Sequence, residues 1–134
     1  MKRFTLQLLD STRSEEIPDL SAFIGEDASG SFGILAGHDR FMTLLLAGLA
    51  RFRVDTGPWI YIAMPGALLS FNHNRLILST RRYLIDDDYT RINRALHEQL
   101  LAEEQKLLGI KQSLQHMEES VLRKLWEMGR RERA

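Results

Sequence analysis

The sequence of 134 residues contains no cysteine, only three prolines and no excess of either charge. Without cysteine the chain has no disulfide, no thiolate nucleophile and no cysteine metal site, a composition compatible with a reducing compartment. The 18 lysine and arginine residues balance the 18 aspartate and glutamate residues. No overall field therefore draws the chain to nucleic acid or anionic lipid, and we expect no nucleic-acid partner.

Long hydrophobic runs are also absent. The longest, residues 41–50, is roughly half of what a membrane-spanning helix needs, and Arg40 and Arg51 close it at either end. The four histidines show no paired metal-ligand spacing, and no nucleotide-binding or calcium-binding motif is present. We therefore expect no direct membrane insertion, no metal site and no cofactor.

Alternating apolar residues predict strands in the first 85 residues. Phe4, Leu6 and Leu8 form one such pattern, and residues 50–54, 59–64, 68–71 and 76–78 form others. Turn-forming residues separate the later runs at positions 56–58, 64–66 and 72–74. Short strands at this spacing predict an antiparallel sandwich or barrel.

The pattern becomes helical after Ile85. Apolar residues recur mostly every three or four positions from Ile92 to Met128, and aspartates at 86–88 suit a helix amino terminus. The segment forms either a helical hairpin with a corner near Gly109 or one long extended helix. The hairpin is preferred, because an extended helix leaves its apolar stripe in water unless another chain covers it.

This stripe also predicts helix–helix contacts. Its spacing over residues 107–121 is that of a coiled coil, and a large aromatic near the end of the chain is suited to anchoring a partner. The predicted helix-partner contacts are Leu114, Met117, Val121, Leu125 and Trp126. One alternative function is therefore a self-associating coiled-coil scaffold protein with a β-sandwich head.

Glycines at 25, 30, 33 and 37 interrupt a strand-like segment. Their spacing differs from the dinucleotide-binding pattern and indicates turns and close backbone packing. Ser31 and His38 are the nearest approach to a catalytic pair, although the Gly-x-Ser-x-Gly spacing is missing. A small hydrolase using these two residues is a third hypothesis, ranked below structural roles for both.

The run from Gly30 to His38, Gly-Ser-Phe-Gly-Ile-Leu-Ala-Gly-His, resembles the glycine-rich segment of the epsilon subunit of rotary ATP synthases, roughly Gly-x-Phe-Gly-Ile-Leu-Pro-Gly-His. The preceding acidic residues and the uninterrupted tail look more like the alternate, sodium-linked bacterial ATPases. The resemblance covers most of the chain and implies a ten-stranded sandwich followed by two helices. With the change of pattern at Asp86, it predicts a β-sandwich domain over residues 1–85 and an α-helical domain over residues 86–134.

The resemblance implies a non-catalytic rotor subunit in the central stalk. Such a subunit binds the gamma subunit, touches the polar loops of the membrane c-ring, and rotates with both. It belongs to a peripheral complex on the cytoplasmic face of the bacterial inner membrane. Its C-terminal helices can contact the catalytic head and hinder ATP hydrolysis. The coupling ion, proton or sodium, is set by another subunit.

The resemblance also selects contact residues. The family's loops that match Ser31 and His38 lie at the c-ring end of the sandwich. The predicted c-ring and gamma interface is therefore Gly30, Ser31, Phe32, Gly37, His38, Asp39 and Arg40. Serine stands at position 31 where the family commonly has an acid, and Glu26, Asp27 or Asp39 can replace that charge. The ATP-binding motif of some relatives is incomplete, because Ile92-Asn93-Arg94-Ala95 has the wrong spacing and no aspartate.

Overall fold

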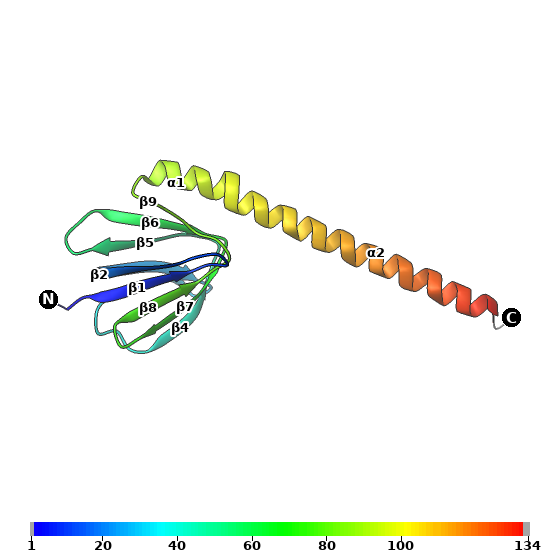
Figure 1. The fold of residues 1–134 in the computed structure, drawn as a ribbon, viewed down its shortest axis with the longest axis horizontal. Helices are drawn as coiled ribbons and strands as arrows, with labels where there is room; N and C mark the ends of the chain where they lie inside the picture. Colours follow the sequence, from blue (N-terminus) through cyan, green and yellow to red (C-terminus); the bar gives the residue numbers. More distant parts are fainter. Residues whose placement is uncertain (1, 133–134) are drawn as a thin grey trace. The chain divides into compact units, whose positions relative to one another are not determined.

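The computed structural model describes residues 2–132 and divides the chain into two compact units. The first extends to Leu101 and contains nine strands, the helix α1 (Tyr89–Ala95) and the π-helical turn η1 (Leu96–Leu101). The second starts at Ala102 and is the helix α2 (Ala102–Glu132). Figure 1 shows the elements of each unit. The domain boundary after residue 85 stays a prediction, while the change from strand to helix falls between residues 86 and 89.

Nine strands form the amino-terminal β-sandwich, which confirms the predicted fold class. The five predicted strands are confirmed as β1, β5, β6, β7 and β8. The bounds are β1 (Phe4–Leu9), β2 (Ser14–Asp27), β3 (Gly30–Ile34), β4 (Phe41–Leu45), β5 (Gly48–Val54), β6 (Trp59–Met64), β7 (Ala67–Asn72), β8 (Arg75–Ser79) and β9 (Leu84–Asp86). The strand order is β1-β8-β7-β4-β2-β5-β6-β9, and β3 pairs with β2. All pairings are antiparallel except that of β1 with β8.

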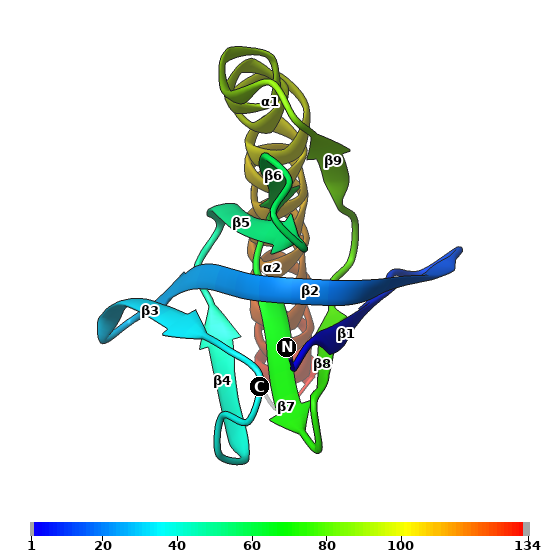
Figure 2. The same ribbon diagram turned by 90° about the vertical axis from the view of Figure 1, so that its left-hand side faces the viewer.

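The long strand β2 serves both layers. Its first half pairs with β1, and its second half pairs with β5 and β3. The change occurs near Ser21, where the register with β5 shifts and the serine hydroxyl donates to the carbonyl oxygen of Asp55 at 2.7 Å. Figure 2 shows β2 running across the sandwich. Residues 14–27 form one continuous strand, and residues 2–132 contain nine strands where the family resemblance implied ten.

The first half of β2 is one of the strands that the sequence pattern missed, and β4 and β9 are others. Residues 14–19 are largely exposed and include Pro18 and Asp19, and Asp19 has a φ of 63°. Such residues are depleted in strands. They are tolerated here because this half of β2 pairs only with β1 and carries little of the core.

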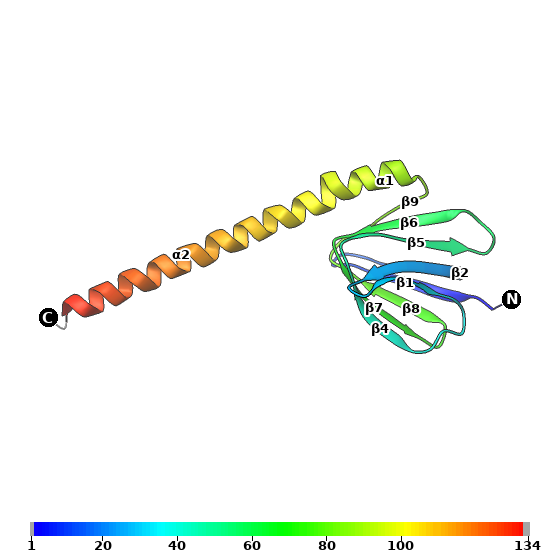
Figure 3. The ribbon, with the colours of Figure 1, turned by 180° about the vertical axis from the view of Figure 1, so that it is seen from behind.

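The core lies between the two layers, which Figure 3 shows with β4, β7 and β8 below β2, β5 and β6. Inward positions alternate along each strand, so the core draws on almost every strand. Its buried residues include Phe4, Leu6, Leu8, Leu20, Phe23, Ile34, Phe52, Ile62, Leu69, Phe71, Leu76 and Leu78. At about 25 cal/mol per Å² of buried apolar surface, this cluster supplies most of the stability of the first unit.

The helix α1 packs on the outer side of β6 and β9. Ile92, Leu96 and Leu100 are buried against Ala63 of β6, with Leu84 of β9 at the edge of the cluster. These contacts account for the first part of the predicted apolar stripe, and they lie within the first unit.

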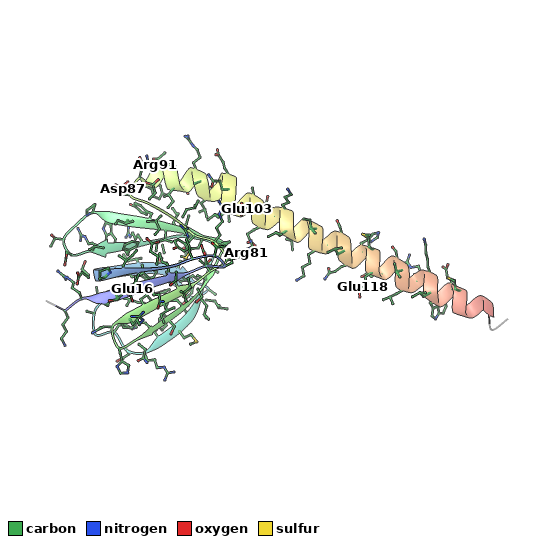
Figure 4. The ribbon with its side chains drawn as sticks, viewed as in Figure 1. Glu16, Arg81, Asp87, Arg91, Glu103 and Glu118 are labelled. Atoms are coloured by element: carbon green, nitrogen blue, oxygen red, sulfur yellow. The ribbon has the colours of Figure 1, made fainter. Side chains whose placement is uncertain are left out.

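The predicted acidic helix start is confirmed. Asp88 is the N-cap of α1, and its carboxylate accepts the Arg91 backbone N–H at 3.0 Å. The Asp86 carboxylate accepts the Asp88 backbone N–H at 3.0 Å and pairs with the Arg91 guanidinium. The Arg91 guanidinium lowers the pKa of Asp86 well below its usual range. Figure 4 labels Asp87 and Arg91 at this helix start.

The preferred hairpin is wrong, because α2 is one helix from Ala102 to Glu132. It passes through Gly109 without a break, and nothing lies within 4 Å of the place where a Cβ would stand on that glycine. A glycine in a helix costs only about 1 kcal/mol relative to alanine, which does not force a corner. Within residues 2–132, no helix combines the length and the apolar character needed to cross a bilayer.

Tyr83 links the β8–β9 connection to the amino-terminal strands. Its side chain is fully buried, its hydroxyl donates to the Glu15 carboxylate at 2.9 Å, and the Arg13 guanidinium lies 4.1 Å from its ring centroid. Arg13 also donates to the Tyr83 carbonyl oxygen at 2.8 Å. Burial, helped by the hydrogen bond to Glu15, raises the pKa of the Tyr83 phenol to about 12.

This raised pKa predicts alkaline destabilisation. A group whose pKa is higher in the folded chain contributes stability that is complete below its ordinary pKa of 10.0 and is lost as the pH rises toward about 12. Tyr83→Phe should be less stable at neutral pH, because Glu15 loses a donor, but its stability should change less between these two pH values. Urea unfolding across this range measures both effects. An equally steep alkaline loss in the variant would show that another group is responsible.

Candidate functional site

The loop between β3 and β4, residues 35–40, contains four of the seven predicted interface residues. Gly37 has a φ of +82°, and its N–H donates to the side-chain oxygen of Asn74 at 2.6 Å. The His38 N–H donates to the Leu35 carbonyl oxygen at 3.1 Å, and the His38 Nδ1 lies 2.7 Å from the carbonyl oxygen of Asp39. The loop is therefore fixed to the β7–β8 turn, with residues 37–40 exposed.

A row of aromatic rings supports this loop. His38 makes edge contacts with Phe41 and Phe71, at centroid distances of 5.6 and 5.8 Å. Phe32 contacts Phe41 at 5.3 Å, and Phe4 contacts Phe71 at 5.6 Å. Such edge contacts add roughly 0.5–1.5 kcal/mol each beyond area burial. The structure thus joins Phe32 of β3 to His38 through Phe41, and Phe71 links the loop to the core.

Replacing Gly37 by valine should destabilise this loop. A β-branched residue is strained at positive φ, and we expect a loss of about 1–3 kcal/mol of unfolding free energy. Gly33→Val is the matched control, because Gly33 has no positive φ and a Cβ added there would stand 3.7 Å from its nearest neighbour, the Phe23 carbonyl oxygen. Thermal unfolding of the two variants compares them. Equal losses would mean that the backbone conformation of Gly37 is not the cause.

Gly30 and Ser31 lie elsewhere, so the expectation of one common end of the sandwich is wrong. Gly30 pairs with Asp27, and Ser31 pairs with Glu26, at the first residues of β3. His38 follows the last residue of β3, and a strand rises about 3.3 Å per residue. The two predicted contact loops therefore lie at opposite ends of β3.

This separation also contradicts the hydrolase hypothesis. A nucleophile and its base need to be about 2.6–3.2 Å apart, whereas the length of β3 separates Ser31 from His38. Ser31 instead borders an open groove of about 420 Å³ with Glu26, Arg51, Tyr61 and Tyr89. The groove lies within the first unit, between the outer face of β5 and β6 and the start of α1.

Of the three acids that can replace a charge at position 31, Asp27 is committed to the fold. Its side chain is buried and accepts hydrogen bonds from the Ser29 N–H at 2.9 Å and the Thr43 hydroxyl at 2.7 Å. The hydrogen bond from the Ser29 hydroxyl contributes most to lowering the pKa of Asp27, followed by that from Thr43. Glu26 and Asp39 are exposed and remain available to a partner.

Sequence reasoning missed an apolar face on the outer side of β4 and β7. Met42 and Leu44 of β4 are 64% and 69% exposed, and Leu68, the cross-strand neighbour of Leu44, is 43% exposed. Leu46, which follows β4, is also exposed. We call Met42, Leu44, Leu46 and Leu68 the β4–β7 face. The signal in the sequence was that Met42, Leu44 and Leu46, the outward positions of this segment, are all apolar, which a strand with one face in water does not need.

The five predicted helix-partner residues all lie on α2 and are exposed. Their exposed fractions lie between 56% and 65% for Leu114, Met117, Val121, Leu125 and Trp126. An amphipathic helix gains most of its stability from packing of its apolar side. Each of these side chains keeps more than half of its surface open to solvent. Their role as partner contacts stays a prediction.

The fold is a two-layer antiparallel sandwich followed by helices. Residues 4–84, more than half of the chain, match the family model described as the ATP synthase, Delta/Epsilon chain, beta-sandwich domain. The chain therefore belongs to this family. A similar curated protein is the ATP synthase epsilon chain 2 of Cereibacter sphaeroides, 37% identical over 87 residues. That alignment covers 64% of this chain and 60% of the relative, so the chain spans less than two thirds of the relative's length.

Two solved assemblies contain chains with a similar fold. One is the Euglena gracilis mitochondrial ATP synthase, OSCP/F1/c-ring, with a TM-score of 0.58 and 20% identity over 72% of this chain and 62% of the other. The second is the central stalk/c-ring of the Tetrahymena thermophila mitochondrial ATP synthase, with a TM-score of 0.53 and 11% identity over 62% and 66%. At these identities the likeness concerns the fold.

Proposed function

We propose that this chain is a non-catalytic central-stalk subunit of a rotary ATP synthase and couples the gamma subunit to the membrane c-ring. Its membership of the delta/epsilon family and its similarity to an ATP synthase epsilon chain support this role. The titles of the two solved assemblies name a c-ring, and one names a central stalk. In this role the sandwich transmits torque between subunits and performs no reaction on a substrate.

The β4–β7 face is the observation that carries the proposal. Met42, Leu44 and Leu68 on this strand pair are exposed, and so is Leu46 directly after β4. Exposed apolar surface of this kind marks a protein–protein interface more often than ordinary surface. A rotor subunit needs a stable contact of this kind with its partner subunit, because the two must stay bound while torque passes between them. We assign this face to the gamma subunit.

The loop of residues 37–40 suits a different partner. It is polar and exposed, and it is held in place by Asn74 and by the aromatic row beneath His38. A fixed loop that contains Asp39 and Arg40 is matched to the polar loops of a c-ring, where charged and hydrogen-bonding groups give specificity. Glu26 is also exposed but lies at the other end of β3, so within this contact the charge missing at Ser31 is supplied by Asp39.

The helix α2 is the regulatory part of the proposal. Its apolar stripe is available to the catalytic head, and binding there would hinder ATP hydrolysis by holding the rotor. The complete subunit would be peripheral, on the cytoplasmic face of a bacterial inner membrane. Whether the ring carries protons or sodium depends on the c subunit.

Affinity purification tests the proposed function. The tagged chain is purified from cells that express their own ATP synthase, and the proteins that come with it are identified by mass spectrometry. We expect the gamma and c subunits, and no ATP hydrolysis by the chain alone. Recovery of neither subunit from solubilised membranes would contradict the role in the stalk.

A further inference from the structure

The apolar residues of α2 follow a heptad with a regularity that goes beyond an amphipathic surface. Counting Leu107 as the first a position, every a and d position as far as Met128 is apolar except one. The a positions are Leu107, Leu114, Val121 and Met128, and the d positions are Ile110, Met117 and Lys124. All of the apolar members are between 45% and 61% exposed. A repeat of 3.5 residues favours another helix as the covering surface.

From this seam we propose that α2 of the free chain pairs with α2 of a second copy as an antiparallel coiled coil. Charges beside the seam favour a second copy and set its direction. In the antiparallel pair, Lys111 at an e position lies beside Glu118, the e position of the second copy. Lys106 at a g position lies likewise beside Glu127. The two-fold axis repeats each pair, so one dimer has four attractive contacts.

A parallel pair lacks this complementarity. There the g position of one helix meets the next e position of the other, which places Lys106 beside Lys111 of the second copy. Like charges at these positions oppose association. The antiparallel register is thus selected by the same four side chains, and all four are exposed on α2. Figure 4 labels Glu118 on this helix.

The core layers fit the same register. Leu114 meets Met117 of the second copy on either side of the two-fold axis, and Ile110 meets Val121 in the next layer out. The outermost layer places Lys124 over Leu107, where the aliphatic stem covers the leucine and the ammonium reaches water. Trp126 lies outside the seam at an outer position. This pairing is independent of the proposed function, since it concerns the chain outside an assembly.

Sedimentation equilibrium of the full chain tests this pairing. We expect a dimer at micromolar concentration, and a weakening of roughly tenfold or more in both Lys111→Glu and Glu118→Lys, because each turns two attractive contacts into repulsive ones. An equimolar mixture of these two variants should recover wild-type association, since the mixed dimer restores both contacts.

The control is Glu119→Lys, which makes the same charge change one residue away, on the side opposite the seam. It should associate like the wild type. A monomeric wild type, equal weakening by Glu118→Lys and Glu119→Lys, or no recovery in the mixture would each overturn the antiparallel pair. Tighter association of Lys111→Glu would show a parallel pair instead, because the change creates an attraction to Lys106.

Discussion

Phe71→Ala should lower the free energy of unfolding of the sandwich unit by about 3–5 kcal/mol, the range for a fully buried phenylalanine. Phe71 has no exposed surface, and its ring contacts Phe4 in the core and His38 in the β3–β4 loop. The variant leaves a cavity between the two and removes both ring contacts. Since small domains have only about 5–15 kcal/mol of stability, a large share of the total is lost. Urea unfolding measures the change.

Two matched variants separate the core effect from the loop effect. Phe71→Leu keeps most of the volume and should cost clearly less than the alanine variant. His38→Ala removes two edge contacts from the exposed side and opens no cavity in the core, so we expect a loss of about 1–2 kcal/mol, below that of Phe71→Ala. If His38→Ala destabilised the chain as much as Phe71→Ala, the loop and not the core would be the main source of stability at this end of the sandwich.

Leu44→Asp should weaken binding to the gamma subunit by about 3 kcal/mol, roughly a hundredfold, without unfolding the chain. Leu44 is 69% exposed in the free chain, and surface changes of this kind usually alter stability by no more than about 0.5 kcal/mol. In the proposed complex the same position is buried. A carboxylate there has no partner among Met42, Leu46 and Leu68, and desolvating it is costly.

Leu44→Ile is the control at the same site. It keeps the apolar area and suits a strand, because β-branched residues pack well on a pleated surface. Titration calorimetry of both variants against purified gamma subunit measures the difference. Equal affinities of Leu44→Asp and the wild type would remove the β4–β7 face from the interface and would assign the contact to another surface.

Much of the fold was predictable because the residues concerned follow rules that depend only on their neighbours in the sequence. Phe4, Leu6 and Leu8 alternate because one face of β1 is in the core, and Asp88 caps α1 because a helix start has free N–H groups. The first half of β2 was missed because its side chains are largely exposed and include Pro18 and Asp19, although its partner β1 is close in the sequence. A local sequence pattern does not predict strand pairing when the side chains of the paired residues are not buried.

The candidate site shows the same division. The glycine at position 37 was correctly linked to a shaped turn, because a positive φ selects glycine. The placement of Ser31 and His38 at opposite ends of β3 depends on pairing with β2, which spacing alone does not encode. The hairpin expected at Gly109 failed for a different reason. An apolar stripe on a helix predicts that another surface packs against it, but it does not show whether that surface belongs to the same chain.

The central claim is that the sandwich is a docking module that joins the gamma subunit to the c-ring. The most direct measurement is calorimetric titration of the wild-type chain into a purified gamma–c-ring subcomplex that lacks it. We predict saturable binding of one chain per subcomplex, strongly weakened by Leu44→Asp and retained by Leu44→Ile. Absence of binding by the wild-type chain, under conditions in which its sandwich is folded, would contradict the account.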